Sequence, residues 1–360
     1  MNHLSESIQQ HIRANWPMLC YVKPHAPRVE FWFSNGRSLA NFSQGIQFYI
    51  QGFDPKDPAY IWSGHSFDRI EVELSELNVD SAIANDQVLD LWQSEESEQA
   101  RQAHDQLVTK AITAIERGLM SKVVLSYAQQ FSAAKVDWLE LLRRLIKVDR
   151  NAFRYLLLHP ELGLWCGATP EVLVSVNENN FSTMALAGTR WQKQDQLPTW
   201  TQKEFDEHNW VVREIIEALG PLAQLHQSDP YSHHAGGLQH LRTDISGTLI
   251  EEHSALDVAR SLHPTPAVCG YPKNAAFNFI QNNEGYNRML YTGYIGLFNP
   301  DQSHADFYVN LRCLQYTKGQ FHLYVGGGLT INSQVQKEWE ETQRKMSTMG
   351  QVIAPFIEQR

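Results

Sequence analysis

The sequence predicts an α+β fold with antiparallel sheets, because runs of adjacent strand patterns alternate with helices inserted between the groups. Four strand patterns follow one another within residues 154–186, and a meander of strands occupies residues 289–325. The chain has 360 residues, of which 42% are apolar and 11% aromatic. It is therefore long enough to bury a large core in one big domain or in two smaller ones.

Taken in order, residues 1–97 contain short strand patterns at 29–33 and 46–50. No residue pattern in this part suggests a catalytic or binding role. An amphipathic helix is predicted at 98–117, with Gly118 as its end. Asp137 is expected to cap the next helix. The later expectations are helices at 202–216, 274–283 and from 335 onward, a surface loop at 226–237, and strands at 289–298 and 305–316.

The last helix carries acidic side chains at the edge of an apolar stripe. Glu338, Glu341 and Lys345 are three and four residues apart, so they project from one face of the helix. Carboxylates beside a buried stripe are costly to desolvate unless a cation or hydrogen-bond donors satisfy them. An exposed edge with a Glu–Lys pair explains this helix equally well when it is considered alone.

The helix at 202–216 repeats the arrangement, which favours the functional interpretation. Glu207 lies one turn before Val211, on the apolar side, and Glu204 lies one turn earlier still. A small number of carboxylates suits Mg²⁺, which keeps several waters and also binds an anionic substrate. The two helices therefore predict a Mg²⁺ site lined by Glu204, Glu207, Glu338 and Glu341.

Composition excludes several other classes of function. The formal net charge of −10, without a run of Lys and Arg, argues against general nucleic-acid binding. Four scattered cysteines favour neither a zinc ribbon nor a disulfide framework. No stretch of membrane-spanning length and no signal-peptide pattern occurs, so we expect a soluble cytoplasmic protein. The absence of GxGxxG and HExxH leaves dinucleotide and zinc-protease functions without support.

Several further positions are candidates for chemistry. Lys122 begins a strand in apolar company, and it is either a surface lysine or a buried general base. Glu171 follows a tight turn, where a solvated carboxylate is ordinary and a partly buried one can act as an acid. Arg312, centred in an alternating strand, is suited to bind a carboxylate. The glycines at 326–328 would form a nest of N–H groups for an anion.

Nine motifs between residue 98 and the C-terminus resemble, in order, those of the chorismate-utilising enzymes, and within that family those of isochorismate synthases. The motifs are Lys122-Val-Val-Leu-Ser, Gly167-Ala-Thr-Pro-Glu171, Leu186-Ala-Gly-Thr189, Glu207-His208, His240-Leu-Arg-Thr243, Leu262-His-Pro-Thr-Pro-Ala-Val-Cys-Gly270, Tyr291-Thr-Gly293, Leu311-Arg312 and Glu338-Trp-Glu-Glu-Thr342, extended to Lys345. The resemblance implies a single large domain of layered antiparallel sheets flanked by helices. Residues 1–97 would be its sheet-rich N-terminal part and 98–360 the chorismate-binding catalytic region.

The resemblance also implies a role for each matching residue. Lys122 matches the base that activates water for attack at C2 of chorismate, and Glu171 matches the acid that protonates the departing C4 hydroxyl. Glu207 and Glu341 match the Mg²⁺ ligands, with Glu204 and Glu338 as outer partners. The positions around the two substrate carboxylates are Gly188, Thr189, His240, Tyr291, Arg312, Gly326 and Lys345.

Related activities differ at two of these positions. Anthranilate synthases carry Gln where Lys122 stands. The aminating members, which are the anthranilate and aminodeoxychorismate synthases, typically have Thr where Ala267 stands. Salicylate synthases share the lysine but usually lack the alanine, so continued pyruvate elimination is the runner-up. A non-catalytic subunit that binds chorismate-like ligands is a third hypothesis. Departures from the family pattern are Tyr127 in place of Arg, Trp191-Gln192-Lys193 after Thr189, and Gly327 in place of Ala.

The expected partner is the small molecule chorismate, with no nucleic acid, no membrane and no glutaminase subunit. A monomer is the default expectation. Menaquinone and catechol siderophore synthesis both begin with isochorismate, so both pathways fit the resemblance.

Overall fold

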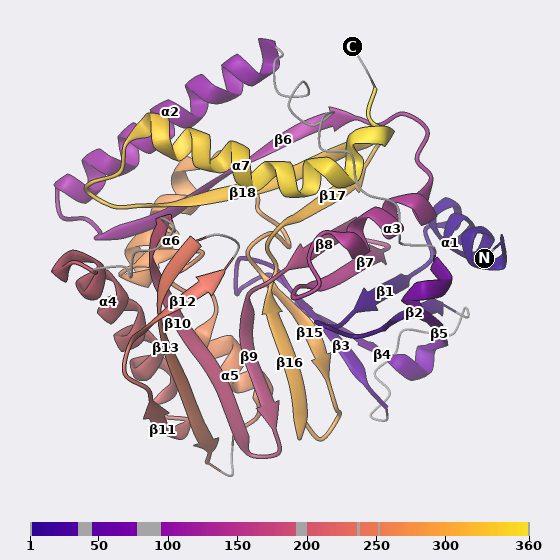
Figure 1. Cartoon of the computed structure of the whole chain (residues 1–360), viewed down its shortest axis with the longest axis horizontal. Helices are drawn as coiled ribbons and strands as arrows, with labels where there is room; N and C mark the ends of the chain where they lie inside the picture. The colour runs from indigo at the N-terminus through magenta and orange to yellow at the C-terminus, as the bar shows by residue number, and fades with distance from the viewer. Residues whose placement is uncertain are drawn as a thin grey trace.

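The fold consists of two large sheets in which every paired strand is antiparallel to its neighbours (Figure 1). The structure is a computed structural model that describes residues 2–34, 45–77, 95–191, 200–235, 238–250 and 253–358. The predicted α+β fold of layered antiparallel sheets is confirmed.

In the described part of the chain, the first sheet has nine strands. In spatial order they are β14 (Gly270–Tyr271), β6 (Lys122–Ser132), β18 (Gln320–Leu329), β17 (Cys313–Thr317), β8 (Gly163–Thr169), β7 (Phe153–His159), β1 (Met18–Val22), β2 (Arg28–Ser34) and β5 (Phe67–Glu73). The second sheet runs in the order β11 (Ala223–Gln227), β13 (Leu238–Leu249), β10 (Asn180–Trp191), β9 (Val172–Asn177), β16 (His304–Val309), β15 (Tyr294–Phe298), β3 (Gln47–Gln51) and β4 (Tyr60–Ser63), with β12 (Tyr231–Ala235) also paired to β13.

The helices cover these sheets from outside. They are α1 (Asn2–Ala14), α2 (Glu95–Glu116), α3 (Trp138–Lys147), α4 (Gln202–Leu219), α5 (Ala255–Leu262), α6 (Lys273–Asn283) and α7 (Val335–Ile353). Asp137 caps α3 as predicted, because its carboxylate accepts hydrogen bonds from the N–H groups of Leu139 and Glu140. In Figure 1, α2 and α7 lie side by side over β6 and β18.

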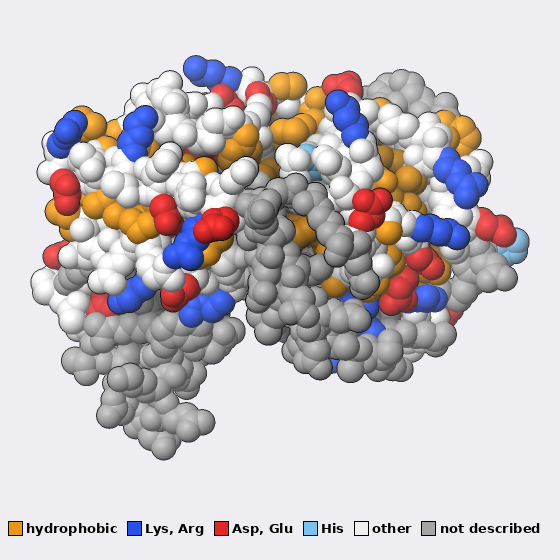
Figure 2. All heavy atoms as spheres, turned by 90° about the horizontal axis from the view of Figure 1, so that it is seen from above, with side chains coloured by type: hydrophobic (Ala, Val, Ile, Leu, Met, Phe, Trp, Pro, Cys, Tyr) orange, Lys and Arg blue, Asp and Glu red, His pale blue; other side chains and the backbone are white. Residues whose placement is uncertain are grey.

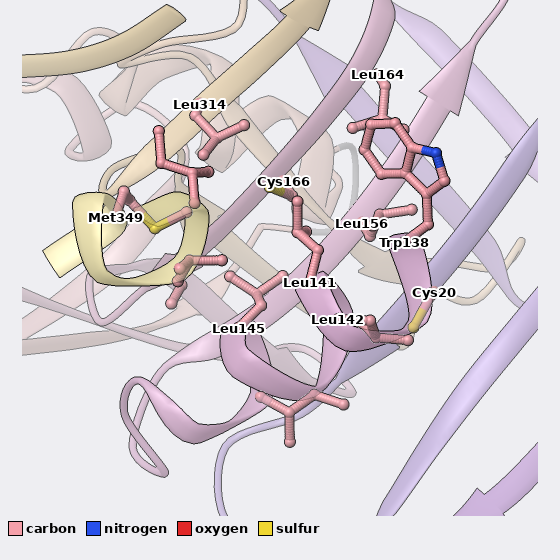
Figure 3. Close-up of a cluster of buried hydrophobic side chains, with 14 of the residues drawn as sticks. Cys20, Trp138, Leu141, Leu142, Leu145, Leu156, Leu164, Cys166, Leu314 and Met349 are labelled. Carbon is pink, nitrogen blue, oxygen red and sulfur yellow. The ribbon is translucent and has the colours of Figure 1, made fainter. Parts of the chain in front are cut away.

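Separate hydrophobic clusters hold the layers together. Figure 3 shows Leu141 and Leu145 of α3 packed with Met349 of α7 against the first sheet, where they meet Leu156 and Cys166. An aromatic cluster that includes Trp32, Phe153, Trp165 and Tyr308 lies between the two sheets. A third cluster joins α4 and α5 to the second sheet. The site described below is built on the strands that this packing fixes.

The N-terminal part contributes to both sheets. Strand β1 pairs with β7 in the first sheet, and β3 pairs with β15 in the second. The chain nevertheless begins with helix α1, whereas the sequence analysis expected only strands in this region. The helix forms because Leu4 and Ile8, one turn apart, bury their side chains together.

Three other local predictions were wrong. The expected loop at 226–237 contains the end of β11 and all of β12, which pair with opposite stretches of β13. Residues 289–298 form a strand only from Tyr294 onward. The expected strand at 305–316 is two strands, β16 and β17, which belong to different sheets.

The face that carries α2 and α7 shows side chains of both charges in Figure 2. Among the residues coloured there, blue and red side chains are interspersed, and no single sign dominates a large area. In the described part of the chain, no helix is long and apolar enough to cross a membrane.

Candidate active site

The chain passes between the two sheets at two adjacent places, and these crossings position Glu171. Strand β8 ends in the first sheet at Thr169, and β9 begins in the second sheet at Val172. The N–H of Val309, at the end of β16, donates to the carbonyl of Glu171 at 3.0 Å, and the Thr169 hydroxyl donates to the Val309 carbonyl. Glu171 is therefore held at a junction of the two sheets.

Arg312 lies in the second crossing, between β16 and β17, and not in the centre of a strand as expected. Its backbone has a φ of +46°, and its carbonyl accepts a hydrogen bond from the N–H of Ala168 at 3.0 Å. The alternation of residue types continues through the crossing, so the sequence pattern did not reveal the bend. The guanidinium donates to the Thr348 hydroxyl of α7 at 3.2 Å, and burial lowers its pKa.

Lys122 is the first residue of β6 and is half-buried. Burial lowers the pKa of its amine, and the carboxylates of Glu207, Glu171 and Glu214 oppose that shift. A Cβ at Gly328 of β18 would lie 3.2 Å from Cε of Lys122. The glycine thus leaves the room that the lysine side chain occupies.

Glu171 shows the opposite shift in the same site. Burial raises the pKa of its carboxyl to about 7, and the positive charges of Lys122, Lys345 and Arg312 limit the rise. A lysine that gives up its proton easily and a carboxyl that keeps its proton near neutrality are suited to act as a base and an acid.

Helix α7 brings further predicted residues to this site. The ammonium of Lys345 lies 2.7 Å from Oε1 of Glu341, and it donates to the carbonyl of Gly326 at 2.9 Å. The pKa of Glu338 is raised by burial and by the negative charge of Glu341, against the effect of a hydrogen bond from Ser333. The helix is held to β6 in part by Tyr127, which stacks on Trp339.

Helix α4 supplies the other two predicted carboxylates, and they differ in their surroundings. Glu207 is half-buried, and its charge acts on Lys122. Glu204 instead accepts hydrogen bonds from the N–H and hydroxyl of Thr201, at 2.8 and 3.0 Å, in a capping box at the start of the helix. His208 is buried and bonded to the Thr243 hydroxyl of β13 at 2.7 Å, so it anchors α4 on the second sheet.

The other predicted substrate residues lie on nearby elements. Thr189 of β10 pairs with His240 of β13, and the register shift between Ala187 and Thr189 places a bulge at Gly188. Ala267 lies in the turn between α5 and β14 and is half-buried. For these four site residues, a role in binding substrate stays a prediction.

Tyr291 and the three glycines are also placed by the structure. The Tyr291 ring is buried and stacks on Tyr324, and a Cβ at Gly326 would lie 2.9 Å from its hydroxyl oxygen. The expected nest at 326–328 is wrong, because all three glycines continue strand β18 and pair with residues 124–126 of β6. Gly328 and Gly326 leave space for the side chains of Lys122 and Tyr291.

The carboxylates of α4 and α7 do not form a closed metal site by themselves. Within the described residues, no three His, Cys, Asp or Glu side chains are close enough together to hold a metal ion. Mg²⁺ often binds through one or two carboxylates, waters and an anionic substrate, so such a site would be completed by the ligand. The fit is supported by Glu338, whose carboxylate is desolvated and repelled by Glu341, since a cation would relieve both costs.

Two groups beside Lys122 were missed by the sequence analysis. Glu214 of α4 has buried carboxylate oxygens, and its negative charge acts on Lys122. Its spacing of two helical turns from Glu207 was the available signal. The second group is the pair of Glu284 and Arg288, which binds the backbone of β6 at Ser126 and Val124, a few residues along the strand from Lys122.

A cavity of about 440 Å³ lies elsewhere, at the far end of the second sheet. Its lining includes Lys23, His304 and Asp306. None of the predicted catalytic residues is among the described residues that line it.

Comparison with known proteins identifies the family. Residues 63–354 match the family model described as chorismate binding enzyme, and this match spans most of the chain. The chain belongs to the chorismate-binding enzymes. The family expected from the motifs is thereby confirmed.

Individual relatives agree with this assignment. The chain is 30% identical to the vibriobactin-specific isochorismate synthase of Vibrio cholerae, over 84% of this chain and 78% of that protein. It is 31% identical to the salicylate biosynthesis isochorismate synthase of Pseudomonas aeruginosa, over 73% of this chain and 57% of that longer protein. The solved menaquinone-specific isochorismate synthase of Escherichia coli is similar with a TM-score of 0.73, covering 94% of this chain and 89% of that one at 20% identity, which supports the fold.

Proposed function

We propose that this chorismate-binding enzyme is an isochorismate synthase, which converts chorismate to isochorismate reversibly. The observation that carries the proposal is the pair of opposite pKa shifts, downward at Lys122 and upward to about 7 at Glu171, in two groups that interact across one site. The names of the relatives in Vibrio and Pseudomonas support the same reaction.

In the proposed mechanism, the Lys122 amine takes a proton from a water molecule, and the water oxygen forms a bond to C2 of chorismate. The Glu171 carboxyl gives its proton to the C4 hydroxyl, which leaves as water while the ring double bonds shift. The shifted pKa of each group makes its starting protonation state accessible near neutral pH. The reverse reaction uses the same two groups with their roles exchanged.

The substrate carries two carboxylates, and the site offers cations for them. Arg312 and Lys345 are proposed to bind these groups, together with Gly188, Thr189, His240, Tyr291 and Gly326. A Mg²⁺ ion held by Glu207 and Glu341 would neutralise the ring carboxylate of the substrate. Without such a cation, the net charge of −10 disfavours binding of an anionic substrate. Glu204 and Glu338 are assigned outer positions, and the capping box of Glu204 supports that assignment.

The test is an assay of chorismate with Mg²⁺, with and without ammonium, followed by chromatography of the products. We expect isochorismate in both cases and no product when a chelator removes the metal. Salicylate would show that the reaction continues to pyruvate elimination. Anthranilate formed only with ammonium would show an aminating enzyme. Chorismate that is bound and recovered unchanged would indicate a non-catalytic subunit.

A further inference from the structure

Glu214 and Lys273 form a partly buried ion pair near the proposed base. Nζ of Lys273, at the start of α6, lies 3.9 Å from Oε1 of Glu214 on α4, and the two side chains are 28% and 14% exposed. Both carboxylate oxygens of Glu214 are buried, and neither has a hydrogen-bond partner among the described residues. The mechanism above gives this carboxyl group no task.

The packing of α4 explains why this carboxyl lies near Lys122. The ring of Trp210 stacks on Tyr271 of β14 with centroids 5.9 Å apart and planes 5° apart. In the sheet, Tyr271 is directly opposite Lys122. Glu214 is one turn after Trp210, and Glu207 is about one turn before it, so the docked face of α4 presents both carboxylates toward the start of β6.

A buried carboxylate without hydrogen bonds is costly, and it either takes up a proton or depends on nearby cations. Burial raises the pKa of Glu214 to about 7, while Lys273 and Lys122 oppose the rise and Glu217 adds to it. The charge of Glu214 therefore changes in the pH range in which the proposed base must work.

We propose that Glu214, held by Lys273, is a positioning residue that controls the protonation of Lys122. The inference deepens the proposed function, because it concerns the base of that reaction. When Glu214 is ionised it favours the ammonium form of Lys122, and when it is neutral it favours the amine. The groups that face this pair from the packed elements are Lys273 and Cys269 near α6, Glu207 and Glu217 on α4, Glu171 before β9, and Lys345 on α7.

The experiment measures the protonation of Lys122 in the free protein, without chorismate or Mg²⁺. Competitive acetylation across a pH series, with mass spectrometry of the peptide that contains Lys122, gives the pKa of this one amine. In Glu214→Gln we expect that pKa to fall measurably, because an interacting negative charge is lost. Glu217→Gln removes the same charge from the exposed side of α4 and is expected to shift it far less, because water screens exposed charges.

Lys273→Met supplies an independent variant in case Glu214→Gln does not fold. Without its cation, Glu214 stays protonated to higher pH, so the pKa of Lys122 is again expected to fall. In the double variant, the loss of Lys273 should add little, because the group through which it acts is already neutral.

An unchanged pKa of Lys122 in folded Glu214→Gln would overturn the proposal, as would an equal shift in Glu217→Gln. Turnover of chorismate by the unaltered protein is measured separately. Failure of the proposed function would appear as absence of isochorismate from that assay, and it would leave the labelling result intact. The acidic limb of the pH–rate profile should also move to lower pH in Glu214→Gln, which a loss of packing alone would not cause.

Discussion

Two buried carboxylates lie near β6, and they differ in how completely they are bonded. Oε1 of Glu284 lies 2.5 Å from Nη2 of Arg288, and both side chains are 1% exposed. Its oxygens accept hydrogen bonds from the N–H and hydroxyl of Ser126, at 2.7 and 3.1 Å. Arg288 donates to the carbonyls of Val124 and Val268, at 2.7 and 2.9 Å. This pair ties β6 to the loop before β14.

Glu214 is paired less closely, because its Oε1 lies 3.9 Å from Nζ of Lys273. In the described part of the chain, no donor forms a hydrogen bond to its carboxylate. A fully bonded buried pair stabilises one arrangement of the backbone, whereas a poorly bonded carboxyl is free to change its charge. The comparison indicates that Glu284 and Arg288 hold the strand on which Lys122 begins, and that Glu214 acts on the charge of Lys122. The predictions that follow test this division.

The largest expected effect is on the bonded pair. Arg288→Met should lower the free energy of unfolding by about 3–5 kcal/mol, because it leaves Glu284 buried without its cation. Lys273→Met should cost only on the order of 1 kcal/mol, because Glu214 can take up a proton instead. Urea denaturation of both variants gives the two values. Equal losses would abolish the distinction between the pairs.

The reacting groups should show the reverse pattern, with a large effect on rate and a small effect on stability. Lys122→Met and Glu171→Gln should each lower kcat by about 10²-fold or more, because each removes a proton-transfer group. Their urea midpoints should stay close to that of the unaltered protein. The check is steady-state kinetics with chorismate beside denaturation curves. Turnover retained by either variant would refute its assigned role.

The charge state of Glu214 should also appear in the pH dependence of stability. The pKa of Glu214 is about 7 in the folded protein and near 4.5 in the unfolded chain. Between pH 4.5 and pH 7, the folded protein therefore keeps a proton that the unfolded chain has lost. The contribution of Glu214 to the free energy of unfolding is thus fully present below pH 4.5. It falls by on the order of 2 kcal/mol as the pH rises to 7. Urea titrations at several pH values should show this decline, and Glu214→Gln should reduce it. If the free energy of unfolding of Glu214→Gln had the same slope against pH as that of the unaltered protein, Glu214 would not be a buried carboxyl that titrates in this range.

A smaller effect is expected at neighbouring glycines of β18. Gly328→Ala places a Cβ 3.2 Å from Cε of Lys122, and a displaced base should lower kcat by roughly 10-fold. Gly327→Ala is the matched control, because its Cβ would lie at an ordinary 3.4 Å from Oε2 of Glu338. Kinetics of both variants decide the point, and equal effects would show that space beside Lys122 is not what matters.

Much of the site could be predicted from the sequence, because several of its residues sit on regular elements with readable spacing. Lys122 at a strand start, Glu207 on α4 and Glu341 on α7 lie on the predicted elements. Glu204 could have been placed better, since Thr201 three residues earlier forms the Ser/Thr-x-x-Glu pattern of a capping box.

Other features could not be predicted from local patterns. The alternation at 305–316 continues through the bend at Arg312, and only the pairing of β16 and β17 with different sheets reveals the crossing. Strand β12 is largely polar, and its sequence alone does not predict a strand. It forms because it pairs with β13. The pairing of Glu214 with Lys273 joins residues from two helices far apart in the chain.

The central claim is that Lys122 activates a water molecule for attack on chorismate. Its most direct test is turnover in H₂¹⁸O with mass spectrometry of the isochorismate formed early in the reaction. We predict that the new hydroxyl carries ¹⁸O from the solvent and that Lys122→Met forms no labelled product. Isochorismate that forms without solvent oxygen, or labelled product from Lys122→Met at the normal rate, would contradict the account.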